Sequence, residues 1–257
     1  PWKELVAPAI ALAEAAQTYD DKVPHAAQVD LGRTLRRIAD GGRDGFYRGE
    51  TARLVAEEMR RGGGLITEAD LAAYEAKERA PVAGVYRGHR VVSMPPPSSG
   101  GVILVEMLNM LEGFAPGTLG HNTTAYMNLV AEIEGRAFAD RSVCLGDPDV
   151  VDVPVATLTS KDYARQRAAT IQVGKRTAPE QIREGQAREK PQTTHFSVVD
   201  RAGGAVAHTT TLNASYGSGI IVGGAGFLLN NEMDDFSVKP GVPNMYGVIG
   251  GTANEIA

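Results

Sequence analysis

The chain contains 257 residues, enough for one large or two small domains with a hydrophobic core. Hydrophobic residues make up 43%, which excludes wholesale disorder, and the net charge of −5 argues against general binding to nucleic acids or anionic membranes. The single cysteine, Cys144, excludes an intrachain disulfide framework and a multi-cysteine zinc site, and no apolar run approaches the ~20 residues that cross a bilayer.

The first two thirds of the chain predict helices, because apolar residues recur at helical spacing and glycines follow several of these runs. Thr67, Asn122 or Thr123, and Ser160 have the pattern of helix N-caps. Asp70, three residues after Thr67, completes a capping-box pattern. The expected helices cover residues 2–17, 29–40, 50–61, 67–74, 102–111, 123–145 and 160–171.

The remaining segments predict strands, a loop and a linker. Residues 82–94 indicate two short strands around a glycine turn, and the three prolines of 95–101 require a loop. Residues 174–192 contain few apolar side chains and are expected to form an exposed, mobile linker. After it the chain alternates as a β-hairpin over 193–213. Two further short strands are expected at 220–222 and 227–229.

At Gln192–Thr193 a polar linker passes directly into a predicted strand whose first residue is a threonine, and this position suggests a catalytic role. A threonine hydroxyl is a weak nucleophile unless a base lies beside it. If the peptide bond before Thr193 is cut, the new α-amine supplies that base, with an ordinary pKa of ~7.7–8.0. On composition alone, Thr193 and Thr194 are better explained as ordinary strand residues after a surface loop.

The segment QTTHFSVVD at 192–200 resembles the processing site of γ-glutamyltransferases (γ-glutamyltranspeptidases), which are N-terminal nucleophile (Ntn) hydrolases. The resemblance covers essentially the whole chain in order. Further matching segments are YRG at 86–88, MPPPSSGG at 94–101, ADRS at 139–142, LGDP at 145–148, TTTLN at 209–213, LLNNEMDDFS at 228–237 and PGVPNMY at 240–246.

The resemblance implies that Thr193 is the nucleophile and that cleavage occurs between Gln192 and Thr193. In the family this threonine attacks the preceding carbonyl and splits a precursor into a large and a small subunit. It then forms a γ-glutamyl ester, which water hydrolyses or an amino-acid or dipeptide amine accepts. Thr211 matches the threonine that hydrogen bonds the nucleophile. Strand alternation would place Thr209, Thr211 and Asn213 on one face.

Asn213, Glu232 and Asp235 match family positions that hold the glutamyl end of the substrate. Carboxylates suit this task, since the substrate's α-ammonium forms charge-assisted hydrogen bonds with them. Asp234 is interpreted as structural. Tyr246 matches a tyrosine of a lid loop whose implied partner is Asn213, and a lid shields an acyl-enzyme from water.

The implied fold is α+β, an αββα four-layer Ntn-hydrolase sandwich, of which this chain holds a part. Residues 1–192 would form the helical, later part of the large subunit, ending in a flexible polar tail. Residues 193–257 would begin the small subunit. The implied donor is glutathione or another γ-glutamyl compound, with no metal or organic cofactor and no nucleic-acid partner. A heterodimer of the two subunits and a periplasmic or secreted location are also implied.

The chain has no initiating methionine or signal peptide and ends within an ordered-looking stretch, so we expect a fragment. Three elements of the family's site have no counterpart in these residues: the arginine and the Ser-Ser pair that contact the substrate carboxylate, and the Gly-Gly pair of the oxyanion hole. We therefore expect little activity from these 257 residues alone. The segment 18–31 is also shorter than its family equivalent. Two alternatives stay open: a glutaryl-type (cephalosporin) acylase of the same superfamily, and a catalytically silent homologue.

Overall fold

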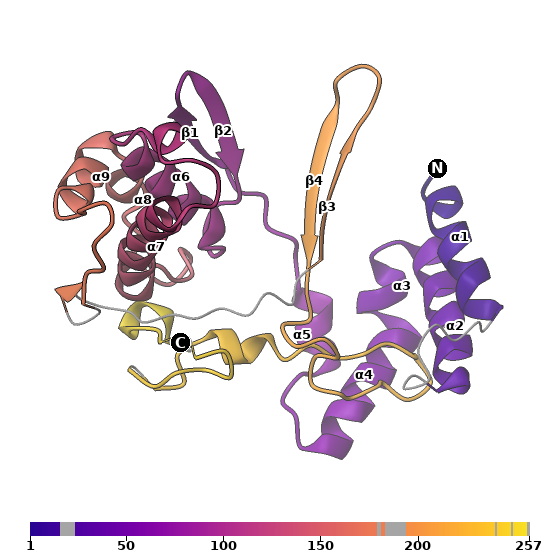
Figure 1. Cartoon of the computed structure of the whole chain (residues 1–257). Coiled ribbons are helices and arrows are strands. Elements are labelled where there is room, and N and C mark those ends of the chain that lie inside the picture. The colour runs from indigo at the N-terminus through magenta and orange to yellow at the C-terminus, as the bar shows by residue number, and fades with distance from the viewer. Residues whose placement is uncertain (16–23, 179–180, 183–193, 240, 248, 256–257) are drawn as a thin grey trace. The chain divides into compact units, whose positions relative to one another are not determined.

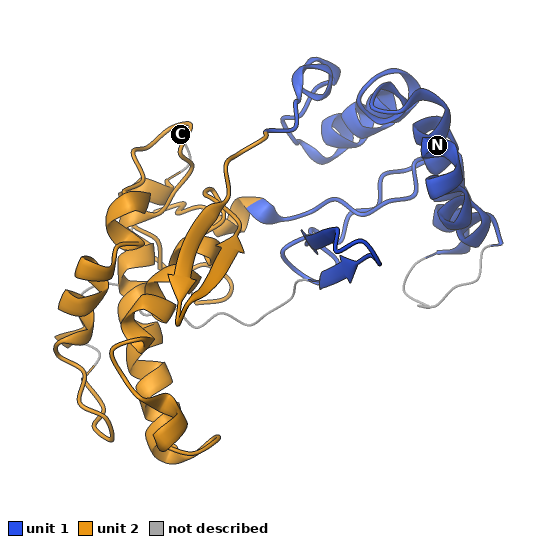
Figure 2. Ribbon diagram, turned by 90° about the horizontal axis from the view of Figure 1, so that it is seen from above, with its two compact units in different colours: residues 1–77, 192–232 blue, residues 78–191, 233–257 orange. Residues whose placement is uncertain are grey.

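A computed structural model describes residues 1–15, 24–178, 181–182, 194–239, 241–247 and 249–255 (Figure 1). The chain forms two compact units, each assembled from two separate stretches of sequence (Figure 2). Unit 1 contains residues 1–77 and 192–232, and unit 2 contains residues 78–191 and 233–257. Each unit is described by itself below.

Unit 1 begins with five helices and ends with a hairpin and a long loop. The helices are α1 (Trp2–Glu14), α2 (His25–Gly41), α3 (Asp44–Tyr47), α4 (Gly49–Gly62) and α5 (Glu68–Ala73). The predicted capping box is confirmed at α5, where the Thr67 side chain accepts from the Asp70 N–H and the Asp70 carboxylate accepts from the Thr67 N–H. Capping of this kind stabilises a helix by about 1 kcal/mol.

The loop after the hairpin is fixed to the helices of unit 1. Val222 and Ala225 are fully buried and pack with Val55 of α4. The hydroxyl of Thr34, on α2, donates to the carbonyl of Ala225 at 2.8 Å. Gly226 has φ +79°, and a Cβ there would lie 2.0 Å from the carbonyl oxygen of Ala27, so a larger residue cannot replace it without moving the main chain.

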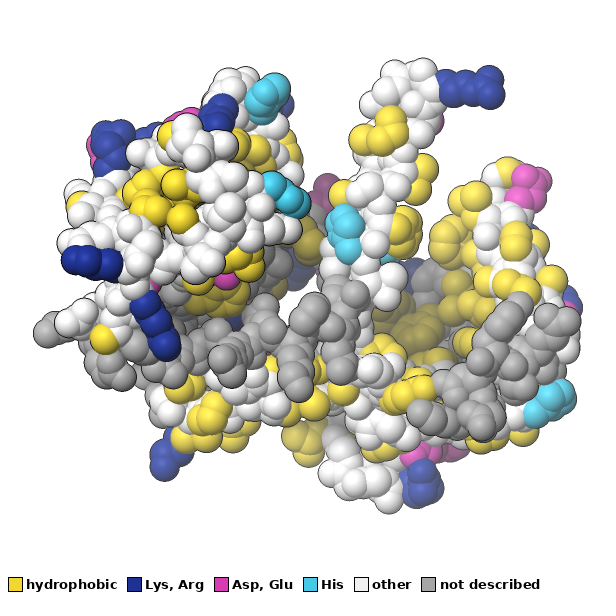
Figure 3. Space-filling model, in the orientation of Figure 1, with side chains coloured by type: hydrophobic (Ala, Val, Ile, Leu, Met, Phe, Trp, Pro, Cys, Tyr) yellow, Lys and Arg dark blue, Asp and Glu magenta, His cyan; other side chains and the backbone are white. Residues whose placement is uncertain are grey.

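The hairpin pairs β3 (Thr194–Val199) with β4 (Ala205–Thr210) in antiparallel register from Thr194–Thr210 to Val199–Ala205. Both strands are exposed along their whole length, and apolar side chains lie on their surface (Figure 3). The large exposed apolar side chains are Phe196, Val198, Val199 and Val206. His195 contacts the hydroxyls of Thr209 and Ser197, in keeping with a structural role for this histidine.

In unit 2 a second hairpin and several helices, among them the longest helix of the unit, pack against one central helix, α6 (Gly100–Leu111). Its other elements are β1 (Val82–Tyr86), β2 (His89–Ser93), η1 (Pro116–Thr118), α7 (Thr124–Cys144), α8 (Val155–Leu158), α9 (Lys161–Ala168) and η4 (Thr252–Asn254). Its core contains Val102, Met110, Leu129, Ile133 and Leu158, each at most 2% exposed. Removing such side chains from water stabilises the unit by about 1.5–3 kcal/mol each.

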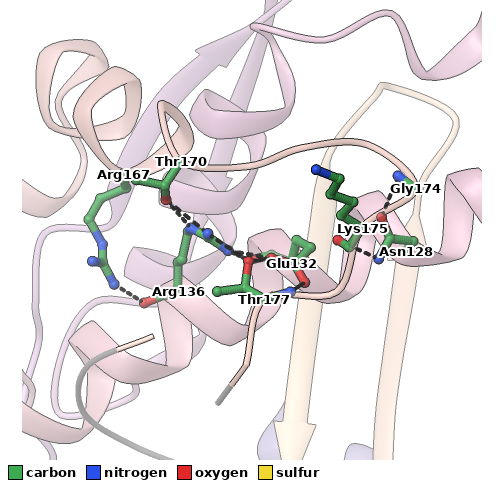
Figure 4. A network of polar contacts seen from close by, with 8 residues as sticks. All are labelled: Asn128, Glu132, Arg136, Arg167, Thr170, Gly174, Lys175 and Thr177. Carbon is green, nitrogen blue, oxygen red and sulfur yellow. Dashed lines mark hydrogen bonds and ion pairs between the residues drawn. The ribbon is translucent and has the colours of Figure 1, made fainter. Parts of the chain in front are cut away.

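Polar contacts tie α7 to the segment that follows α9 (Figure 4). Arg136 and Glu132 pair at 2.8 Å with both side chains 4% exposed, and Glu132 also accepts from the Thr177 N–H at 2.7 Å. Burial opposes the charged form of Glu132, but the Thr177 and Arg136 hydrogen bonds outweigh it and lower its pKa. Asn128 accepts from the Gly174 N–H at 2.8 Å. Residues 174–177, expected to be mobile, are therefore held by α7.

A second buried cluster joins α6, α7 and α9. Glu106 of α6 is fully buried, and Arg167 of α9 pairs with Asp140 of α7 at 2.7 Å. Burial, reinforced by the nearby Asp140 carboxylate, raises the pKa of Glu106 to about 9. Tyr163, also on α9, has its pKa raised by burial and by Asp140. Glu106 is therefore protonated at neutral pH while Arg167 balances the Asp140 charge.

The α+β class is confirmed, and each predicted helix is present with ends shifted by a few residues. Thr123 and Ser160 are confirmed as N-caps. The prediction of short strands at 220–222 and 227–229 was wrong. These segments form only the isolated Ile221–Leu228 bridge. The glycine-rich turn between them reverses the chain before a longer ladder can form. No helix among the described residues is long and apolar enough to cross a membrane.

The two compact units do not coincide with the predicted division at residues 192 and 193. Each unit includes residues from before and after that position. The short helix η3 (Glu232–Asp235) spans the point where the chain passes from unit 1 to unit 2. The predicted division concerns a covalent cut, and it stays a prediction.

The Glu106 pKa makes the stability of unit 2 depend on pH. The folded pKa of about 9 lies above the ordinary 4.5, so the folded state binds more protons between these values and stability falls as pH rises. The slope is at most about 1.4 kcal/mol per pH unit. We expect Glu106→Gln to flatten the fall in melting temperature between pH 5 and 9. Glu134→Gln, at an exposed position on α7, is the control, and equal slopes for Glu106→Gln and parent would contradict the assignment.

Candidate functional site

The predicted nucleophile adjoins one end of the β3–β4 hairpin. Gln192 and Thr193 lie outside the described residues, and β3 begins at Thr194, which pairs with Thr210. Chain connectivity places Thr193 directly before this pair and Thr211 directly after it. The two residues predicted to carry hydroxyls in the reaction therefore flank the same end of one hairpin in sequence.

Thr211 and Asn213 form a tight turn rather than a continuation of the strand. We expected alternation to continue to Asn213, but β4 ends at Thr210 and Asn213 has φ +67°. Asparagine tolerates this left-handed conformation better than most residues. The Thr211 hydroxyl oxygen accepts from the Asn213 N–H at 2.9 Å, which satisfies that donor without a strand partner.

A clasp between two loops holds Asn213, which is 7% exposed. Its side-chain amide donates to the Asn231 carbonyl at 3.0 Å, and the Ala214 N–H donates to the Asn231 side-chain oxygen at 2.9 Å. The Asn231 N–H completes the clasp by donating to the Leu212 carbonyl at 3.1 Å. Asn231 immediately precedes Glu232, so the clasp brings two predicted substrate-binding segments together within unit 1. The sequence alone did not identify Asn231.

Glu232 and Asp235 lie at opposite ends of η3 and belong to different units. Glu232 is half-buried, and its N–H donates to the Asn230 side chain at 3.0 Å. Asp235 is exposed, and its carbonyl accepts from the Asn254 side-chain amide at 2.7 Å. A carboxylate acceptor is thus present in each unit for a cationic ligand.

The predicted lid loop is anchored within unit 2. The Met245 N–H donates to the Asp234 carboxylate at 3.2 Å, which supports the structural interpretation of Asp234. The half-buried Tyr246 donates its N–H to the Asn244 side chain at 3.0 Å, and Pro243 bridges to Ile249. The predicted pairing of Tyr246 with Asn213 joins residues of different units and stays a prediction.

The site chemistry is that of hydroxyls, amides and carboxylates. Within the described part of the chain, no three His, Cys, Asp or Glu side chains converge as a metal site would require. A small cavity of about 160 Å³ in unit 2 lies between the η3 end and the lid loop, lined among others by Asp234, Asp235, Asn244 and Asn254. Lys239 and the apolar side chains of Phe236, Val242 and Pro243 also line this cavity, so its lining is of mixed character.

The family model for gamma-glutamyltranspeptidase matches residues 17–257. The chain belongs to this family. The glutathione hydrolase proenzyme of Escherichia coli K12 is 52% identical over 231 residues, covering 89% of this chain and 40% of the relative. The acylase ACY 1 proenzyme of Pseudomonas sp. SE83 is 41% identical over 218 residues, covering 83% of this chain and 38% of the relative.

The crystal structure of Helicobacter pylori gamma-glutamyltranspeptidase is similar to this chain with a TM-score of 0.59 and 44% identity. The match covers 60% of this chain and 44% of that one. The family resemblance seen in the sequence is thereby confirmed, as is the Ntn-hydrolase relationship of the fold. The chain spans less than half the length of these curated relatives.

The Thr211–Asn213 turn can be tested through stability alone. Thr211→Val removes the acceptor of the Asn213 N–H, and a lost partner for a largely buried donor costs about 1–3 kcal/mol. We expect a lower melting temperature for Thr211→Val, while Thr211→Ser, which keeps the hydroxyl, melts close to the parent. If Thr211→Val instead melts at the same temperature as the parent, the hydrogen bond to the Asn213 N–H does not stabilise the turn.

Proposed function

We propose that this chain carries the nucleophile and part of the substrate site of an enzyme that hydrolyses and transfers γ-glutamyl groups. The observation that carries the proposal is membership of the gamma-glutamyltranspeptidase family together with a threonine at position 193, directly before the hairpin. Glutathione is the proposed donor, and the glutathione hydrolase relatives support this choice.

We propose that activation begins with cleavage between Gln192 and Thr193. The Thr193 hydroxyl oxygen adds to the Gln192 carbonyl carbon, and the C–N bond breaks as the nitrogen gains a proton, which leaves an ester. Water hydrolyses that ester to a Gln192 carboxylate and restores the hydroxyl. The freed α-amine then lies beside the hydroxyl as its base. The word proenzyme in the names of the relatives supports a processed product.

In the catalytic cycle, Thr193 attacks the γ-glutamyl amide carbonyl after losing its hydroxyl proton to its own amine. That proton passes to the departing amine, and a γ-glutamyl ester remains on Thr193. Water then releases glutamate, or a second amine takes the γ-glutamyl group. The Thr211 hydroxyl is proposed to hydrogen bond the Thr193 oxygen. Thr211 directly follows Thr210, whose strand partner Thr194 directly follows Thr193 in the sequence, and this supports the role.

Selectivity for γ-glutamyl groups would come from Glu232, Asp235 and Asn213. The carboxylates supply negative charge for the substrate's α-ammonium, and charge-assisted hydrogen bonds are stronger than neutral ones. The clasp through Asn231 supports this proposal, since it fixes Asn213 and the start of η3 in one loop arrangement. A lid containing Tyr246 would shield the ester from water.

A glutaryl-type acylase is the alternative enzyme, and the acylase relative at 41% identity favours keeping it. A glutaryl group lacks the α-ammonium, so Glu232 and Asp235 would face no positive charge in its complex. A catalytically silent homologue is the alternative outside these enzyme classes. It would leave the Gln192–Thr193 bond intact, which makes processing the first observation to test.

We expect the intact gene product to be cut between Gln192 and Thr193. Intact-mass spectrometry should show two polypeptides in the parent, one beginning at Thr193, and a single uncut chain in Thr193→Ala. Thr194→Ala is the matched control, because it alters the neighbouring hydroxyl and should still be cut. An uncut parent with no γ-glutamyl turnover would support the silent homologue.

Substrate choice separates the two enzyme classes. We expect kcat/KM of the processed protein to be about 10–100-fold higher for γ-glutamyl-p-nitroanilide than for glutaryl-p-nitroanilide, from hydrogen bonds to the charged ammonium. Release of p-nitroaniline measures both substrates in one assay. A preference for the glutaryl compound would instead identify an acylase.

A further inference from the structure

We propose that Asn254 is a positioning residue, which fixes the Asp235 end of the substrate site against α7. The inference rests on the proposed function, because it takes Asp235 as a ligand of the substrate's α-ammonium. It adds a residue that lies 19 positions further along the chain and that no motif in the sequence marks.

Asn254 connects to the Asp235 turn through two short hydrogen bonds. Its side-chain amide donates to the Asp235 carbonyl at 2.7 Å, and its own carbonyl accepts from the Ser237 N–H at 2.7 Å. Ser237 is 6% exposed and also forms a parallel bridge with Glu255. One residue thus holds the main chain on both sides of Phe236, directly after the predicted ligand.

The other side of Asn254 is fixed to α7. It belongs to η4, which packs on the end of α7, and the Gly251 N–H just before η4 donates to the Ser142 carbonyl at 2.7 Å. A Cβ at Gly146 would lie 2.0 Å from the carbonyl oxygen of Ala253. The main chain at Gly146 therefore packs directly on the main chain at Ala253. This close approach restricts the position of Asn254, the next residue.

These contacts form a continuous path from a buried helix to an exposed carboxylate. Ser142 of α7 is 7% exposed, whereas Asp235 is exposed and lies in a short 3-10 turn. The direction of an exposed side chain depends on the main chain that carries it, since the backbone dihedrals limit its rotamers. Holding that main chain before the substrate arrives reduces the ordering that binding must impose. Asn254 thereby acts on substrate affinity through Asp235.

The effect should appear in affinity for the charged ammonium and not in the chemical step. In the intact, processed gene product we expect Asn254→Ala to raise KM for γ-glutamyl-p-nitroanilide about 10-fold at nearly unchanged kcat. L-glutamate and glutarate differ only in the α-ammonium. The inhibition constant for L-glutamate should rise by a similar factor, and that for glutarate should stay constant.

Three further variants make the test decisive. Thr252→Ala, at an exposed position in η4, should behave as the parent, and melting temperatures show whether each variant is folded. Asp235→Asn should lose the same discrimination between L-glutamate and glutarate. The Asp235→Asn, Asn254→Ala double variant should lose no more than Asp235→Asn alone, as expected for two residues acting in one path.

The outcomes separate this inference from the proposed function. If Asp235→Asn loses discrimination and a folded Asn254→Ala keeps it, the positioning role is overturned and the proposed function stands. If the folded Asn254→Ala weakens L-glutamate and glutarate equally, Asn254 is merely structural and the inference is again overturned. If the processed parent hydrolyses no γ-glutamyl compound, the proposed function itself has failed, and the inference fails with it.

Discussion

Close approach of main chain to main chain at two glycines is the constraint on which the candidate site depends. In unit 1 the Gly226 position touches the Ala27 carbonyl of α2, and in unit 2 Gly146 touches the Ala253 carbonyl. Each contact joins a segment after residue 193 to a helix or turn before it. A side chain at either glycine would push these segments apart, because the oxygen lies at about half of an ordinary van der Waals distance from the Cβ it would carry. In each unit, a loop from the part of the chain that carries the predicted ligands thereby packs closely on an earlier helix or turn.

Hydrogen bonds from polar side chains then fix the loops that the glycine contacts bring close to the helices. In unit 1, Thr34 fixes the Ala225 carbonyl, and the Asn231 clasp fixes Asn213. In unit 2, Asn254 fixes the Asp235 carbonyl. These three hydrogen bonds end on main-chain carbonyls, so they set the path of the loops. Each hydrogen bond adds only about 0.5–1.5 kcal/mol to the free energy of unfolding. Their main effect is to fix the course of the loop main chain.

The sequence predicted features that depend on neighbouring residues and failed where the partner is distant. The caps at Thr67, Thr123 and Ser160 were predictable because each bonds to an N–H within three residues. Family motifs pointed to Thr211 and Asn213, but not to the left-handed turn that ends β4 there. No role was predicted for Asn231 or Asn254, because their hydrogen-bond partners lie up to 19 residues away. Residues 174–177 looked like linker because their acceptors belong to α7.

The arrangement of the units bears on what a cut before Thr193 would do. Unit 1 combines residues 1–77 with 192–232, and unit 2 combines 78–191 with 233–257, so both pieces contribute to both units. Cleavage would free an α-amine without releasing either unit, since the Thr34–Ala225 and Ser142–Gly251 hydrogen bonds do not involve the broken peptide. A nucleophile made by cutting its own chain needs this property, because the piece that carries it would otherwise lose the helices on which its loops pack. Non-covalent docking across the cleavage point is therefore a requirement of the proposed chemistry, and the glycine contacts meet it in both units.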